Sequence, residues 1–113
     1  MKLSHKLKGK VLVITIHGDV EATQAKRLKS YCLEQMEENK SEVVVLDIEE
    51  VPYIDSMGLS SFLSMYKAVR QEDGVFAVAA PQKEVQKLFE LCCLDKIFVV
   101  YDSVEEACEG LQQ

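Results

Sequence analysis

The sequence predicts an α/β fold, in which a mixed β-sheet of about five strands opens with a β-hairpin and carries about four α-helices in the order ββαβαβαβα. Several short runs are apolar at consecutive positions, which is typical of strands buried on both faces between helices. Segments with apolar residues spaced three and four apart alternate with these runs, as in amphipathic helices. A length of 113 residues and a hydrophobic share of 48% fit one domain, residues 1–113, whose core needs no metal or disulfide.

The N-terminal part of the chain predicts the hairpin and the first helix. Residues 3–7 form a short strand, Gly9 lies in the turn, and residues 11–16 form a strand that is apolar on both faces. A helix follows over about residues 23–38, capped by Thr23 or a nearby acid. Its predicted inner face consists of Ala25, Leu28, Cys32 and Met36.

The middle of the chain predicts a second strand and helix. Residues 43–48 form a strand buried on both sides, and Pro52 in the loop after it keeps the preceding residue out of helical geometry. The next helix covers about residues 56–72 and ends at Gly74. Its predicted stripe is Leu59, Phe62, Leu63, Tyr66 and Val69.

Two further strand and helix pairs complete the prediction. Residues 75–79 form a buried strand, Pro81 opens a helix, residues 97–101 form the last strand, and Ser103 caps the last helix. The inner faces of these two helices are predicted to be Val85, Leu88, Phe89 and Cys92 in the first, and Val104, Ala107, Cys108 and Leu111 in the second.

Charge and composition exclude several classes of protein. Lys and Arg number 13 against 19 acids, and a net charge of −6 argues against nucleic-acid binding, which depends on phosphate contacts. No apolar run approaches the roughly 18–20 residues that span a bilayer, so no membrane insertion is expected. The N-terminus lacks the apolar segment of a secretory signal, and we expect a cytoplasmic protein. The four cysteines lack metal-ligand spacing and are interpreted as small buried hydrophobic residues.

The sequence offers no complete enzymatic or nucleotide-binding motif, and we expect neither a cofactor nor a bound metal. Ser56 has Gly58 two residues after it but Ile54 two residues before, so the G-x-S-x-G turn of serine hydrolases is incomplete. Neither a Walker A loop nor G-x-G-x-x-G is present. The acids between Asp47 and Asp55 are compatible with a solvated loop or with a magnesium site, and spacing alone does not separate the two.

Residues 54–59, I-D-S-M-G-L, place an Asp-Ser pair at the predicted start of a helix. Ser56 is interpreted either as an N-terminal capping residue or as a regulated hydroxyl. With its upstream strand the stretch reads V-V-V-L-D-I-E-E-V-P-Y-I-D-S-M-G-L, and it resembles the STAS domain family, specifically the stand-alone anti-sigma factor antagonists of bacteria. The earlier H-G-D-V-E-A-T resembles a second family segment, G-E/D-L-D-x-x-T/N, and the order of elements agrees over nearly the whole chain.

The resemblance implies a partner-switching protein that is not an enzyme. Ser56 occupies the position of the family's phosphorylated serine. The unmodified form would bind an anti-sigma factor that is also a serine kinase and so release sigma factor, phosphorylation would end binding, and a serine phosphatase would reset it. The implied partner surface consists of Asp55, Ser56, Met57, Gly58, Asp19, Glu21 and Thr23. Glu21 departs from the family's usual Asp, which puts its contact in doubt.

Two alternatives to this function stay open. The first is an unphosphorylated STAS subunit of a transporter or stress-sensing complex, in which Ser56 is only a helix cap. The second is a receiver-like domain phosphorylated on Asp47, at the end of its strand. A receiver needs an acidic pair after its first strand and a late lysine before proline, and neither is present here.

Overall fold

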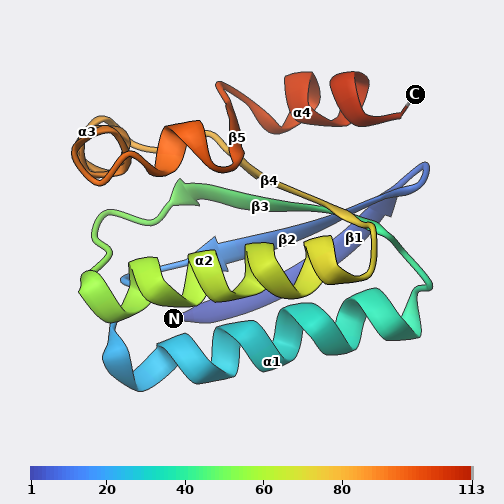
Figure 1. The fold of residues 1–113 in the computed structure, drawn as a ribbon, viewed down its shortest axis with the longest axis horizontal. Coiled ribbons are helices and arrows are strands. Elements are labelled where there is room, and N and C mark those ends of the chain that lie inside the picture. Colours follow the sequence, from blue (N-terminus) through green and yellow to red (C-terminus); the bar gives the residue numbers. More distant parts are fainter. Residues whose placement is uncertain (113) are drawn as a thin grey trace.

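Five strands and four α-helices occur in the predicted order within residues 1–112, which the computed structural model describes (Figure 1). A single 3-10 turn, η1, is added to them. The elements are β1 (Lys2–Lys8), β2 (Val11–His17), α1 (Ala22–Glu38), β3 (Val43–Glu50), α2 (Ser56–Gln71), β4 (Val75–Ala79), α3 (Lys83–Leu91), η1 (Leu94–Lys96), β5 (Val99–Tyr101) and α4 (Val104–Leu111).

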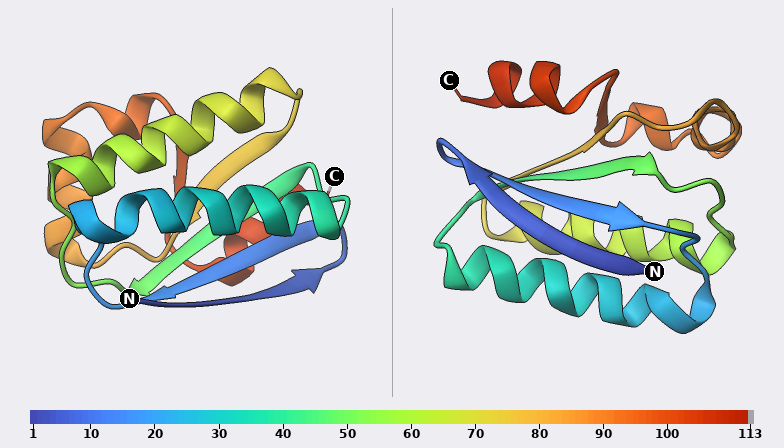
Figure 2. Two further views of the ribbon diagram at one scale, coloured as in Figure 1. Left: turned by 90° about the horizontal axis from the view of Figure 1, so that it is seen from below. Right: turned by 180° about the vertical axis from the view of Figure 1, so that it is seen from behind.

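The strands form one mixed sheet in the order β1-β2-β3-β4-β5. β1 is antiparallel to β2, and all other neighbouring pairs are parallel. Helices α1 and α2 lie on one face of the sheet and α4 lies on the opposite face, as the views in Figure 1 and Figure 2 agree. Because parallel neighbours end at the same edge, the loops after β2, β3 and β4 gather at one end of the sheet.

Each side of the sheet has its own apolar layer, which explains the doubly apolar strands. Along β2, Leu12, Ile14 and Ile16 point into the larger layer beneath α1 and α2. Val11 and Val13 point into the smaller layer beneath α4. The larger layer includes an aromatic cluster in which Phe62, Phe76, Phe89 and Phe98 pack against one another.

The inner face of α2 differs from the predicted stripe. Buried positions include Ser61 and Met65, whereas Leu59, Leu63 and Tyr66 are only half-buried. Ser61 is part of this buried face and satisfies its hydroxyl by donating to the Gly58 carbonyl at 2.7 Å. A buried hydroxyl that bonds within its own helix can lie in an apolar core without a large desolvation cost, and apolar periodicity alone does not reveal it.

One helix start agrees with the prediction and one helix end differs from it. The N-cap of α1 is Glu21, the nearby acid expected as the alternative to Thr23, and its backbone N–H donates to Gln24 Oε1 at 3.3 Å. At the end of α2 the left-handed residue is Asp73, with φ 60°, rather than Gly74. A glycine is needed at position 74 for a different reason: a Cβ there would lie only 2.6 Å from the Glu42 carbonyl oxygen, which packs against it.

The segment between α3 and α4 corrects two further predictions. The last strand begins at Val99, not at residue 97, because η1 occupies the chain before it and Phe98 is buried in the core. Cys92 follows the end of α3 and is exposed, as is Cys93, so the interpretation of all four cysteines as buried hydrophobic residues is wrong for this pair. Cys32 and Cys108 are buried as expected.

Candidate functional site

The two sequence segments that resemble family motifs lie side by side at one end of the sheet. Because β2 and β3 are parallel neighbours, the chain leaves both strands at the same edge. The Gly18 N–H donates to the Glu50 carbonyl at 3.0 Å and the Val20 N–H to the Tyr53 carbonyl at 3.0 Å. The Asp55 N–H donates back to the Val20 carbonyl at 3.1 Å. The two loops therefore form one hydrogen-bonded unit.

The Asp55 side chain joins the N-termini of two helices. Its Oδ1 accepts from the Gly58 N–H of α2 at 2.8 Å, so Asp55, and not Ser56, is the N-cap of this helix. Its Oδ2 accepts from the N–H of Ala22, the first residue of α1, at 3.0 Å. A carboxylate at a helix N-terminus also interacts favourably with the helix dipole. Asp55 therefore fixes the loops of the site relative to each other.

Gly58 is a packing residue. It is buried, and a Cβ there would lie 2.5 Å from the Val20 carbonyl oxygen and 2.7 Å from Ile54 Cγ2. The glycine faces the neighbouring loop and lets it approach the first turn of α2. Gly58, which the resemblance placed on the partner surface, is buried and shapes the site from inside.

Ser56 is the first residue of α2 and is exposed. None of the side-chain hydrogen bonds found within residues 1–112 involves its Oγ. Two large apolar residues close to it in sequence are also exposed, Tyr53 with 52% and Met57 with 54% of the residue surface accessible. The hydroxyl is thus offered to solvent beside apolar surface, as a site of modification within a docking surface requires.

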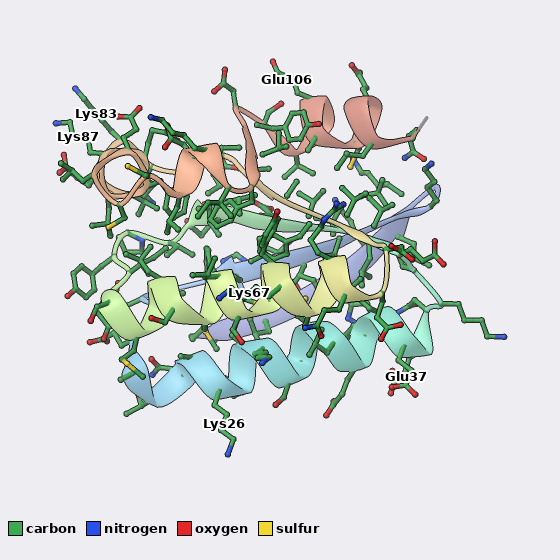
Figure 3. The ribbon with its side chains drawn as sticks, in the orientation of Figure 1. Lys26, Glu37, Lys67, Lys83, Lys87 and Glu106 are labelled. Atoms are coloured by element: carbon green, nitrogen blue, oxygen red, sulfur yellow. The ribbon has the colours of Figure 1, made fainter. Side chains whose placement is uncertain are left out.

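The loop after β2 adds acidic groups to the same end of the sheet. Asp19, Glu21 and Thr23 are exposed, so the carboxylates of Asp19 and Glu21 add to that of Asp55 around the two loops. The basic residues early in α1 direct their charged ends to other groups. Lys26 points away from α2 (Figure 3), while Arg27 donates to the Met1 carbonyl at 3.1 Å and Lys29 donates to Ser64 Oγ at 2.6 Å.

A groove beside Ser56 brings in residues that sequence reasoning missed. It has a volume of about 420 Å³ and runs between the start of α2 and helix α3. The α3 side contributes Glu84, Leu88 and Cys92, which are more than 25 positions from Ser56 in the sequence. The sequence carried no signal for this arrangement, because the exposure of Cys92 is known only from the structure.

The acids near the end of β3 are used locally. Asp47 Oδ2 accepts from Thr15 Oγ1 at 3.3 Å, and its Oδ1 accepts from the Glu49 N–H at 3.2 Å. Within residues 1–112 no group of three or more His, Cys, Asp or Glu side chains is arranged to hold a metal ion. In the same residues no helix combines the length and the apolar character that crossing a bilayer requires.

Comparisons with a family model and with individual known proteins point to the same family. The sequence model of the STAS domain matches residues 3–107. The chain is 26% identical to the anti-sigma F factor antagonist of Paenibacillus polymyxa over 102 residues, covering 90% of this chain and 87% of that protein.

Two solved structures show the same fold. One is a Thermotoga maritima protein assigned as an anti-sigma factor antagonist, with a TM-score of 0.91, 22% identity, and coverage of 98% of this chain and 95% of that one. The other is the Bacillus cell fate determinant SpoIIAA in its phosphorylated form, with a TM-score of 0.73, 14% identity, and coverage of 97% and 99%. The match favours this family over the receiver interpretation.

Proposed function

The chain belongs to the STAS domain family, and from this premise we propose that it is an anti-sigma factor antagonist switched by phosphorylation of Ser56. The unmodified form binds an anti-sigma factor that is also a serine kinase, and binding releases sigma factor. Transfer of a phosphoryl group from ATP to Ser56 Oγ ends binding, and a serine phosphatase restores it. The protein is a regulatory binding module and a kinase substrate, not an enzyme. The names of its relatives support the antagonist role.

The observation that carries the proposal is the exposed Ser56 hydroxyl at the N-terminus of α2. The N–H groups at the start of an α-helix have no intrahelical acceptor and carry partial positive charge. The Gly58 N–H is already bonded to Asp55, whereas those of Ser56 and Met57 precede it in the first turn. A phosphate on Ser56 can bond to them, so the modified helix need not unfold.

Phosphorylation would oppose docking through charge. The phosphoryl group adds roughly −1.5 to −2 charges at neutral pH. It would stand beside the Asp55 carboxylate and near two acids of the loop after β2, Asp19 and Glu21. A partner that covers Tyr53 and Met57 would also have to desolvate the phosphate, which costs several kcal/mol unless a cation compensates it.

The direct test is to incubate the protein with ATP and the anti-sigma factor/kinase of the same organism. Mass spectrometry is expected to locate one phosphate on Ser56, and Ser56→Ala is expected to remain unmodified. Ser56→Ala should bind the kinase with unchanged affinity, and Ser56→Asp should bind at least about tenfold more weakly, since about 1.4 kcal/mol of repulsion suffices for that factor. Ser30→Asp, which adds the same charge at an exposed position of α1, is the matched control.

Equal affinity of the wild type, Ser56→Ala and Ser56→Asp would refute the switch. The remaining alternative is a STAS subunit of a transporter or stress-sensing complex. It predicts that Ser56 stays unmodified and that the protein co-purifies with a transporter ATPase or a large assembly instead of a small kinase.

A further inference from the structure

Strand β1 forms one open edge of the sheet and is much longer than the opposite edge. It extends over seven residues, whereas β5 has three. Figure 2 (left) shows β1 at the outer side of the sheet, with no other element of residues 1–112 beyond it. Along such an edge alternate backbone N–H and C=O groups have no partner within the sheet and can pair with another strand.

The C-terminal end of β1, at Lys8, is held in place by the side chain of Gln112. Gln112 Nε2 donates to the Lys8 carbonyl at 2.6 Å, and Gln112 Oε1 accepts from the Lys10 N–H at 3.3 Å. At the other end Arg27 Nη1 donates to the Met1 carbonyl at 3.1 Å. The edge of residues 2–7 is therefore already extended before a partner binds, which lowers the entropy cost of pairing.

The two faces of β1 differ sharply in character. Leu3, His5 and Leu7 lie opposite Ile16, Ile14 and Leu12 of β2, on the side of α1, where His5 Nδ1 lies 2.7 Å from Tyr31 Oη. Leu7 is 48% exposed and leaves apolar surface at this edge. The alternate residues Lys2, Ser4, Lys6 and Lys8 point to the side of α4, which packs on β2 to β5.

The charge on β1 is opposite to that of the whole protein. Residues 1–10 contain four lysines and no acid, although the net charge of the chain is −6. A second copy pairing antiparallel about His5 would place Lys2 opposite Lys8 and Ser4 opposite Lys6, and like charges directly opposite each other destabilise a pair of strands. The lysines disfavour self-pairing and favour a strand that carries acids on this face.

We propose that the open edge of β1 binds an extended acidic segment of a partner protein by adding it as a further strand to the sheet. The segment alternates acidic and apolar residues: the acids face Lys2, Lys6 and Lys8, and the apolar residues lie beside Leu3 and Leu7. The backbone hydrogen bonds supply affinity, and the lysine stripe selects the sequence. This surface is separate from Ser56, which lies at the start of α2.

The test uses a blocked peptide, Glu-Val-Glu-Val-Glu-Val-Glu, titrated into the full-length protein and followed by backbone amide NMR and calorimetry. The expected result is saturable binding with the largest shifts at residues 2–7. The Lys6→Glu variant is expected to bind about five- to thirtyfold more weakly, because a cross-strand attraction becomes a repulsion. Lys83→Glu on α3 carries the same charge change and should bind as the wild type, and so should Ser56→Asp, which separates this surface from the switch.

Two further probes identify the mode of binding. A peptide N-methylated at alternate residues keeps its charge but cannot form the strand hydrogen bonds, and it should not bind. If the methylated peptide binds as well as the unmodified one, the attraction is only electrostatic and the proposal fails. Vesicles containing phosphatidylglycerol test whether the lysines bind lipid instead. If the wild type binds these vesicles but not the peptide, and Lys6→Glu abolishes vesicle binding, the lysines belong to a membrane-binding surface and the proposal is overturned. Circular dichroism verifies that each variant is folded.

Discussion

Replacing Asp55 by alanine should destabilise the protein more than the loss of an ordinary helix cap. One carboxylate oxygen accepts from the Gly58 N–H at 2.8 Å and the other from the Ala22 N–H at 3.0 Å. Loss of an N-cap costs about 1 kcal/mol. A hydrogen bond to a charged acceptor adds about 1.5–3 kcal/mol, and the lower end applies because water can replace the carboxylate at the exposed Ala22 N–H. The expected total is about 2–3 kcal/mol.

Ser103→Ala is the matched control, because the Ser103 hydroxyl caps α4 by accepting a single bond, from the Glu106 N–H at 3.1 Å. It should cost about 1 kcal/mol. Urea unfolding followed by circular dichroism measures both variants against the wild type, with m held in common. Amide hydrogen exchange should accelerate in residues 18–22 in Asp55→Ala and remain unchanged there in Ser103→Ala. If Asp55→Ala costs no more than Ser103→Ala, the carboxylate does not couple the two helices.

Three other predictions concern packing, cysteine accessibility and the pH dependence of stability. Gly58→Ala should destabilise the protein by about 1–3 kcal/mol in urea unfolding, because the new Cβ would lie 2.5 Å from the Val20 carbonyl oxygen. Gly110→Ala, where only the Tyr101 ring must yield, should be neutral or stabilising, and a similar cost for both would contradict the packing argument. A thiol reagent should modify two cysteines in the native protein and four only after unfolding, because Cys92 and Cys93 are exposed whereas Cys32 and Cys108 are buried. Burial raises the pKa of Cys32 from 9.0 to about 12, so above pH 9 the unfolded chain loses this proton while the folded protein keeps it. Stability should therefore fall as pH rises from 9 towards 12, by about 1 kcal/mol one unit above the unfolded pKa, and the fall should be smaller in Cys32→Ala.

The order of elements and the position of Ser56 were predictable from the sequence because both depend on local patterns. The runs at residues 11–16 and 43–48 are apolar at all positions but one each, Thr15 and Asp47, and such runs are typical of strands covered on both faces. The Asp-Ser pair that follows the second run is a helix-start signal, and α2 begins at Ser56 as predicted. Local signals were weaker in the irregular segment between α3 and β5. The sequence prediction therefore missed η1 and placed the start of β5 too early.

By itself, then, the sequence determined the order of strands and helices and the place of a serine at a helix start, since neighbours within a few residues decide backbone preference. Only the tertiary structure decided that Asp55 caps two helices, that Gly58 faces Val20, and that α3 borders the site. Each of these relations joins residues that the chain order separates, and they arise because parallel strands bring their ends to one edge of the sheet. Spacing in the sequence does not encode which loops meet there; the pairing and register of the strands do.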